Sequence, residues 1–171
     1  MLRLHLGCGQ RLLEGWVNVD LPGGGHFGKT PDLEHDLTKP LPYEDATADE
    51  VFSSHVFEHF ERWTAEDVLT DWVRVLKPGG RIVLEMPCFD KIVGYVADCV
   101  DAGRPIDLRM SLWGLYGDPR HGDPSMMHRW CYSRGEILAM FKARGLNAEV
   151  KEPLTHIAAR DMRIEGVKRG D

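Results

Sequence analysis

The sequence contains no long apolar run, few cysteines and no excess of positive charge. No stretch approaches the roughly 20 apolar residues that a membrane-spanning helix needs, and no charged leader precedes the apolar residues that begin at Leu2. The four cysteines form no C-x-x-C pair, which favours reduced thiols in a reducing compartment. The net charge of -6 argues against a surface for nucleic acid, which needs clustered Lys and Arg. We therefore expect a cytoplasmic protein that binds neither membranes nor nucleic acids.

Short apolar segments recur along the chain and alternate with amphipathic ones. A chain of 171 residues that is 43% apolar suits one domain with its own core. Runs typical of buried strands occur at Leu2–Leu6, Trp16–Asp20, Asp32–Leu37, Glu50–Ser54, Gly80–Met86, Leu146–Glu152 and Ala159–Lys168. Strands alternating with helices predict an α/β fold with a doubly wound, mostly parallel, Rossmann-like sheet of about seven strands.

Three segments have the pattern of helices. Thr64–Asp67 resembles a capping box, and apolar residues follow it at helical spacing. We expect Lys77–Gly80 to end this helix, because proline cannot continue it. A second helix is predicted over 132–144 with Ser133 as its cap, and a third around Lys91–Ala102.

The first two connections between the expected strands are poor candidates for helices. Only Gly7–Gly15 separates the first two apolar runs, whereas a parallel crossover usually takes about a dozen residues or more. The second connection, Leu21–Pro31, holds four glycines and two prolines and cannot form a stable helix. One face of the sheet would therefore lack helices, and we expect a homo-oligomer to form through that face.

The first motif that suggests a binding site is the segment LHLGCGQRLLEGWVNVD, residues 4–20. Gly7, Cys8 and Gly9 directly follow an apolar run, and Asp20 ends the next one. Glycines let a ligand approach the backbone, and an acidic residue at a strand end can accept hydrogen bonds from ribose hydroxyls. Dinucleotide sites place the acid about 20 residues beyond the glycines, with a helix between. Alone, the segment fits either a cofactor site without its helix or a hairpin with glycines.

Further motifs follow in order: SSHVFEHF at 53–60 and LKPGGRIVLEMP at 76–87. With LGCG at 6–9, they resemble the class I S-adenosylmethionine-dependent methyltransferases. The similarity is strongest to the small-molecule, methyltransferase-11-like branch, in a compact variant that lacks the first crossover helices. It covers residues 3–86 and continues more loosely through 132–145 to DMRIEGVK at 161–168. The resemblance implies an antiparallel strand at the C-terminal end of the sheet and S-adenosylmethionine as the cofactor.

The resemblance also implies which residues hold this cofactor. Gly7 and Gly9, with Cys8 between them, would let the backbone wrap the methionyl part, and Asp20 would take the ribose hydroxyls. This agrees with the rule that open α/β sheets bind ligands beyond the carboxyl ends of their strands. The implied contacts to the adenine and to the methionine with its reactive methyl come from Leu21, Asp36, Leu37, Ser53, Ser54 and His55.

The histidines around His55-Val-Phe-Glu-His59 admit other roles. H-x-x-E-H is also an inverted zinc-protease pattern, and two histidines four apart on a helix can share a metal. The stretch opens at a strand end and no third ligand is indicated, so we predict no metal. If a hydroxyl accepts the methyl group, a general base can help. His55 and His128 are the predicted catalytic residues, ahead of His59 and His121.

Residues 90–131 follow the fifth expected strand and form a substrate-side insert or cap in a single domain, 1–171. The aromatic and Met side chains of this insert fit either a wall over the cofactor or ordinary core packing. The predicted function is methyl transfer from S-adenosylmethionine to a small molecule, with a hydroxyl of a saccharide or related metabolite as the expected acceptor. The alternatives are a non-catalytic S-adenosylmethionine-binding module and a methyltransferase acting on nucleic acid or protein. The missing third glycine disfavours a nicotinamide oxidoreductase.

Overall fold

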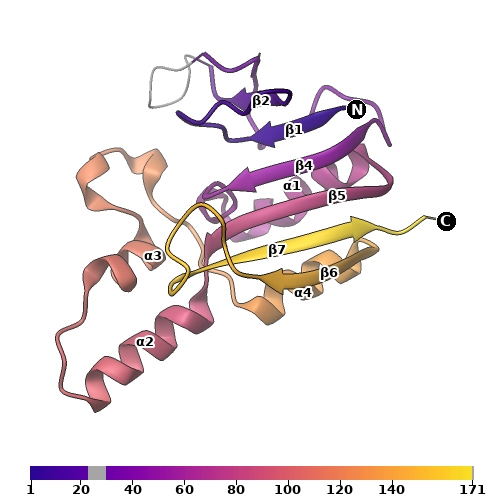
Figure 1. Ribbon diagram of the computed structural model, residues 1–171. Helices are drawn as coiled ribbons and strands as arrows, with labels where there is room; N and C mark the ends of the chain where they lie inside the picture. The colour runs from indigo at the N-terminus through magenta and orange to yellow at the C-terminus, as the bar shows by residue number, and fades with distance from the viewer. Residues whose placement is uncertain (23–29, 171) are drawn as a thin grey trace.

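A computed structural model of the chain describes residues 1–22 and 30–170. It contains one sheet with the strand order β3-β2-β1-β4-β5-β7-β6 (Figure 1). The strands are β1 (Arg3–Leu6), β2 (Val17–Asp20), β3 (Leu33–Glu34), β4 (Ala48–Ser54), β5 (Leu76–Pro87), β6 (Leu146–Lys151) and β7 (Asp161–Lys168). The α-helices are α1 (Arg62–Val75), α2 (Phe89–Asp101), α3 (Leu112–Tyr116) and α4 (Arg134–Ala143). None of the described helices is long and apolar enough to cross a membrane.

The sheet confirms the predicted fold class. Strands β1 to β5 pair in parallel, and β7 lies antiparallel between β5 and β6. Each predicted strand is present, although β3 has two residues where the sequence suggested Asp32–Leu37. β5 begins at Leu76, so Lys77–Gly80 belongs to an irregular start of the strand and the preceding helix has already ended at Val75.

The connection from β1 to β2 is a parallel crossover without a helix. Leu4 is in register with Val17, which excludes a hairpin and confirms the missing helix. The chain turns at Gly7, whose φ is +71°. A Cβ atom there would lie 2.2 Å from Cγ2 of Val56, so only glycine fits. The second connection includes residues 23–29, which lie outside the described residues.

A buried asparagine on β2 holds the short crossover in place. Asn18 is 4% exposed. Its Oδ1 accepts a hydrogen bond from the Leu13 backbone at 2.8 Å and lies 3.1 Å from Nδ1 of His5. Its Nδ2 donates to the Leu13 carbonyl at 3.1 Å and to the Asp32 carboxylate at 2.7 Å. One side chain thus links β1, the crossover, β2 and the segment before β3, in the place where a helix would otherwise pack.

Helices α1 and α4 cover one face of the sheet, behind it in Figure 1. The proposed capping box at Thr64 is wrong, because α1 begins two residues earlier and the Thr64 amide donates to the Glu61 carbonyl at 2.9 Å. The start of α4 is as predicted: Ser133 caps it by accepting a hydrogen bond from the Glu136 amide at 3.2 Å. α2 starts and ends within two residues of the expected Lys91–Ala102.

No helix of the described residues covers the opposite face of the sheet (Figure 1). Arg81 on β5 forms ion pairs with Glu50 and with Glu165, at 2.5 and 3.8 Å. Near β1 and β2, Trp16 stands edge-on to Phe52 with ring centroids 6.2 Å apart. Ion pairs between strands and this aromatic pair therefore occupy the sheet face that helices cover in doubly wound folds.

The segment between β5 and α4 extends beyond the carboxyl ends of the parallel strands (Figure 1). It contains α2, α3 and three short 3₁₀ turns, Leu108–Met110, Pro119–His121 and Pro124–Met126. The segment between β6 and β7 crosses the uncovered face toward the same end of the sheet. Both segments therefore reach the edge where ligands bind in open α/β sheets.

Replacing Asn18 tests whether this residue stabilises the crossover. We expect Asn18→Ala to lower the free energy of unfolding by about 2 kcal/mol or more, because buried donors and acceptors lose their partners. The matched control is Asn147→Ala, where an exposed side chain bonds only to Arg169; its cost should stay below about 0.5 kcal/mol. Urea unfolding measures both, and equal losses would contradict the assignment.

Candidate functional site

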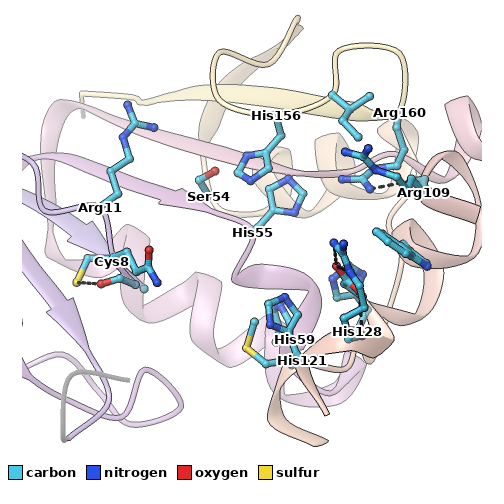
Figure 2. A pocket seen from close by; sticks show the side chains of 18 of the residues that line it. Cys8, Arg11, Ser54, His55, His59, Arg109, His121, His128, His156 and Arg160 are labelled. Atoms are coloured by element: carbon cyan, nitrogen blue, oxygen red, sulfur yellow. Dashed lines mark hydrogen bonds and ion pairs between the residues drawn. The ribbon is translucent and has the colours of Figure 1, made fainter. Parts of the chain in front are cut away.

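A cavity of about 560 Å³ opens at the carboxyl ends of β1 and β4 (Figure 2). Four segments contribute to it: the turn from Gly7 to Arg11, the end of β4 at Ser54 and His55, the insert, and the segment before β7. The volume is within the range of small-ligand sites, about 300–1,000 Å³. Segments far apart in the sequence thus meet at one site.

Five of the predicted cofactor residues line this cavity: Gly7, Cys8, Gly9, Ser54 and His55. Asp20 lies beside the glycine turn, since its carboxylate accepts hydrogen bonds from the Gly9 amide at 2.6 Å and the Leu21 amide at 2.8 Å. Burial, with the nearby Asp20 carboxylate, raises the pKa of the Cys8 thiol to about 11. Cys8 is therefore a neutral thiol near pH 7 and not a nucleophile.

Four other predicted residues do not line the cavity formed by the described residues. Leu21 is half exposed, and Leu37 packs into the hydrophobic core. Asp36 accepts hydrogen bonds from the amide and hydroxyl of Thr38, which lower the pKa of its carboxyl. Ser53 is 1% exposed, and its hydroxyl donates to the Leu6 carbonyl at 2.9 Å. The Ser53 side chain therefore faces the core, and Ser54 is the serine at the cavity.

His55 occupies a strained position between two buried carboxylates. Its φ of +55° lies in the left-handed region, which is rare for a residue other than glycine. Nδ1 is 3.0 Å from Glu58 Oε1, and Nε2 is 3.4 Å from Asp161 Oδ2. Burial alone would lower the pKa of His55, but the two carboxylates outweigh it and raise the pKa to about 9. His55 is therefore protonated at neutral pH.

Asp161 joins His55 to the insert. It is completely buried, and Arg160 approaches both of its oxygens, Nε at 2.6 Å from Oδ1 and Nη2 at 3.0 Å from Oδ2. Arg160 also donates from Nη1 to the Arg109 carbonyl at 2.9 Å. Burial would raise the pKa of Asp161, yet His55 and Arg160 hold it at about 2. Asp161 is thus an ionised carboxylate that anchors the histidine and the arginine together.

Glu58 is the second buried carboxylate, with 1% of its surface exposed. Burial would raise the pKa of this carboxyl, but pairing with His55 keeps it below its usual range. The Glu58 carbonyl accepts hydrogen bonds from the amides of Arg129 and Trp130, at 2.7 and 3.2 Å. The end of the insert is therefore tied directly to the turn that follows β4.

A third buried acid positions the segment before β7. Glu85 on β5 is 1% exposed, and its carboxylate accepts hydrogen bonds from the Leu154 amide at 2.7 Å and from the amide of Thr155 at 3.2 Å. Beyond this anchor, the His156 ring lies against His55, with centroids 3.9 Å apart (Figure 2). Sequence reasoning missed His156. The available signal was Glu85, a charged residue inside an apolar run, which indicated that some polar segment must contact it in the interior.

The cavity also has a cationic lining that the sequence analysis did not identify. The side chains concerned are Arg11, Arg109, Arg120 and Arg160. Of the aromatic and Met residues expected to form a wall, Trp113 and Met126 line this cavity, and Arg120 lies 4.6 Å from the Trp113 ring centroid. Arginines scattered among prolines and glycines give no local signal, because only the fold brings them together.

Comparisons with known proteins find a methyltransferase family model and similar folds. A family model described as "Methyltransferase domain" matches residues 25–84. A SAM-dependent methyltransferase from Archaeoglobus fulgidus has a TM-score of 0.67 at 15% identity, over 97% of this chain and 85% of that chain. One from Methanosarcina mazei has a TM-score of 0.65 at 15% identity, over 99% and 92%. No curated protein matches the sequence.

A further similar structure is a Haloferax volcanii complex between the Trm112 methyltransferase activator and a methyltransferase. It has a TM-score of 0.60 at 18% identity, over 99% of this chain and 83% of that chain. These structures show the shared fold, and the family model matches residues 25–84 of the chain. Both findings favour a methyltransferase that uses S-adenosylmethionine.

Replacing Asp161 tests the buried charges beneath the cavity. We expect Asp161→Asn to lower the free energy of unfolding by about 3–5 kcal/mol, because it leaves Arg160 buried without its counter-charge and His55 with Glu58 alone. The control is Glu152→Gln, whose side chain is 75% exposed and pairs with Lys91 at 3.1 Å. A surface pair of this kind contributes about 1 kcal/mol at most. Similar losses in urea unfolding would contradict the assignment.

The same variant should change the acid dependence of stability. The pKa of Asp161 falls from 3.8 to about 2 on folding, so its contribution is complete above pH 4 and disappears as the pH falls through about 2. Between pH 5 and pH 2 the wild type should lose about 2 kcal/mol more than Asp161→Asn does. If the free energies of unfolding of the wild type and of Asp161→Asn changed equally with pH, folding would not lower the pKa of Asp161, and the prediction would be contradicted.

Proposed function

We propose that the cavity binds S-adenosylmethionine at the glycine turn and a small acceptor molecule between His55 and the insert. One observation carries the proposal: a single cavity runs from Gly7 and Gly9 past His55 to Arg109 and Trp113. In this arrangement the chain is one methyltransferase domain over residues 1–171, and residues 90–131 are its substrate-side insert.

The residues present fit the cofactor. Gly7 and Gly9 have φ values of +71° and +51°, so their turn bends without Cβ atoms that would obstruct a ligand. Asp20 has lone pairs left for ribose hydroxyls beyond the two amides that it already accepts. The adenine would extend beyond the cavity, and we assign it to Leu21, to Asp36 and to the backbone amide of Leu37, whose side chain is in the core. When bound, the cofactor supplies a methyl group activated by a sulfonium sulfur.

At the methyl end, we assign the binding of the methionine part to Cys8, Ser54 and His55, and to Ser53 through its backbone alone, because its hydroxyl bonds to the Leu6 carbonyl. Ser54 and His55 are the side chains of this group that end β4 at the cavity. The protonated His55 can donate a hydrogen bond to an acceptor or cofactor oxygen. His128 is the remaining candidate for proton acceptance, because its Nδ1 faces the Gly114 carbonyl at 2.9 Å and Nε2 stays available.

The expected acceptor is a hydroxyl of a saccharide or related metabolite. Trp113 offers an aromatic face, and Arg109 favours an acceptor that also carries a carboxylate or phosphate. Arg120 and Arg160 are already paired with Asp118 and Asp161. Methylation of a hydroxyl releases its proton, which the site must pass to a base or to water. The alternative acceptors, nucleic acid or protein, would need binding surface well beyond this cavity.

Two further proposals concern the surroundings of the protein. The four thiols, Cys8, Cys88, Cys99 and Cys131, are unpaired in the structure, which supports a reducing, cytoplasmic location. The absence of membrane and nucleic-acid partners also stays a prediction of the sequence.

Self-association through the uncovered sheet face stays a prediction as well. Trp16, Phe52 and the exposed Val167 are apolar groups available there, while Arg81, Glu50 and Glu165 already pair within one chain. We therefore expect a dimer only at tens of micromolar, and substitution of Trp16 by Glu should abolish it. Light scattering that gives the mass of one chain at that concentration would contradict the prediction.

Titration calorimetry tests cofactor binding. We expect S-adenosylmethionine and S-adenosylhomocysteine to bind the wild type, and Asp20→Ala to weaken both by about 10- to 100-fold, because charge-assisted hydrogen bonds to the ribose are lost. Since Asp20 also holds the Gly9 amide, thermal unfolding must confirm that the variant is folded. Glu149→Gln, at the far edge of the sheet, should bind like the wild type. If neither S-adenosylmethionine nor S-adenosylhomocysteine binds to the wild type, the proposal is contradicted.

If both compounds bind, turnover distinguishes an enzyme from a non-catalytic module. Transfer of labelled methyl to members of a panel of acidic and neutral saccharides supports the proposed reaction. Binding without transfer to any acceptor would favour the binding module.

A further inference from the structure

We propose that Glu58, His59 and His128 form a binding site for a divalent transition-metal ion of the Zn²⁺ type at the wall of the cavity. The nitrogen and carboxylate atoms that these three side chains can offer all lie within 4.8 Å of one another. Two of the residues sit in the 3₁₀ turn η2 (Phe57–His59) that follows β4, and the third comes from the insert. The site exists only because the fold brings these two segments together.

Both histidines are oriented as metal ligands usually are. Nδ1 of His59 lies 3.2 Å from the Met127 carbonyl oxygen, and Nδ1 of His128 lies 2.9 Å from that of Gly114. A carbonyl oxygen can only accept, so each Nδ1 must carry the proton. When such a ring is uncharged, its lone pair is then on Nε2. Metal-binding histidines are typically fixed by a second hydrogen bond of this kind.

The two rings also face the carboxylate. His59 and His128 stand nearly perpendicular, with centroids 4.9 Å apart, and Figure 2 shows them on the same wall of the cavity. Nε2 of His128 is 3.9 Å from Glu58 Oε1. Two imidazole nitrogens and one carboxylate thus converge, with the cavity beside them for a fourth ligand.

Glu58 supplies an independent indication of a cation. Its side chain is 1% exposed, and among the residues that the structure describes no hydrogen bond reaches Oε2. His55 compensates one oxygen at most, from 3.0 Å at Oε1. A carboxyl oxygen buried without a hydrogen-bond partner is costly. A metal ion between Glu58 and the two histidines would satisfy it.

The ligands differ from those that the H-x-x-E-H pattern suggests. His55, the first histidine of the pattern, is held by Asp161 from Nε2 and by Glu58 from Nδ1, so both of its nitrogens are engaged. His128 takes the place of the missing third ligand. Spacing along the chain does not indicate this ligand, because His128 is far from the pattern in the sequence.

The ligand set favours Zn²⁺, Mn²⁺ or Fe²⁺ over Mg²⁺ and Ca²⁺, which prefer oxygen ligands. Tetrahedral Zn²⁺ at about 2.0–2.2 Å from its ligands keeps them about 3.4 Å apart. The three side chains would therefore close by about 1 Å on binding. Three protein ligands with one open position are typical of catalytic rather than structural zinc.

The role of the ion rests on the proposed function. An acceptor hydroxyl at the open position would bind the cation, which lowers the pKa of the hydroxyl. With Nε2 of His128 bound to the ion, His128 no longer accepts the proton; the proton leaves to solvent water, and the acceptor oxygen forms the new bond to the methyl carbon. The methyl–sulfur bond breaks, and its electron pair stays on the sulfur.

The test titrates Zn²⁺ into the full chain after dialysis against a chelator, with Mg²⁺ in parallel. We expect one Zn²⁺ per chain and no comparable Mg²⁺ binding. Glu58→Gln and His128→Gln should weaken Zn²⁺ binding at least about 100-fold, more than loss of an outer hydrogen-bond partner costs. His121→Gln, which alters another histidine at the cavity, is the matched control and should bind as the wild type does.

His55→Gln distinguishes the two possible ligand sets. We expect it to retain Zn²⁺ binding, with thermal unfolding as the check that each variant is folded. Binding that His55→Gln abolishes but His128→Gln leaves intact would overturn the proposal, as would a wild type without a Zn²⁺ site. X-ray absorption of the Co²⁺-loaded wild type needs no variant: it should detect histidine ligands, and their absence would also overturn the proposal.

S-adenosylhomocysteine titrated into the same preparation separates this inference from the proposed function. If S-adenosylhomocysteine binds and Zn²⁺ does not, the metal site is rejected and the proposed function stands. If Zn²⁺ binds and S-adenosylhomocysteine does not, the metal site stands and the proposed function is contradicted.

Discussion

The position of His55 between the buried carboxylates of Glu58 and Asp161 is the interaction on which the site depends. Glu58 belongs to the turn after β4, and Asp161 begins β7, so their shared histidine joins two strands that are distant along the chain. This arrangement explains why a non-glycine residue keeps a left-handed backbone, because both ring nitrogens are held. Through Arg160 the same charges reach Arg109 in the insert. The insert is therefore fixed to the sheet by buried electrostatics at the edge of the cavity.

The uncovered sheet face imposes a second constraint, which polar residues resolve. Asn18 holds the helix-free crossover, and Glu85 holds the segment that carries His156 across the sheet. Both residues are buried in positions where a conventional fold of this class would have apolar contacts with helices. Because each polar group finds several partners, burial does not leave it unsatisfied. A compact chain can in this way keep the sheet order of the class without a helix between β1 and β2.

The sequence predicted the elements whose signals are local. Apolar runs gave the strands, Ser133 gave the start of α4, and the glycine turn gave one end of the cavity. The pattern at Thr64 misled because α1 starts earlier, at a point with no capping side chain. Asn18, His128 and Asp161 were not assigned their roles, since each acts through partners elsewhere in the chain and neither spacing nor periodicity reports such contacts. A charged residue inside an apolar run, as at Glu85, was the one signal of this kind that the sequence did contain.

The central claim is that cofactor, acceptor and the histidine cluster share one cavity. A crystal structure with S-adenosylhomocysteine tests it most directly. The account predicts the methionine part at the Gly7–Gly9 turn, the ribose at Asp20, and the sulfur facing His55, with the vacant methyl position open toward His128. A sulfur atom directed away from His55 and the insert would contradict the account, even if the compound is bound.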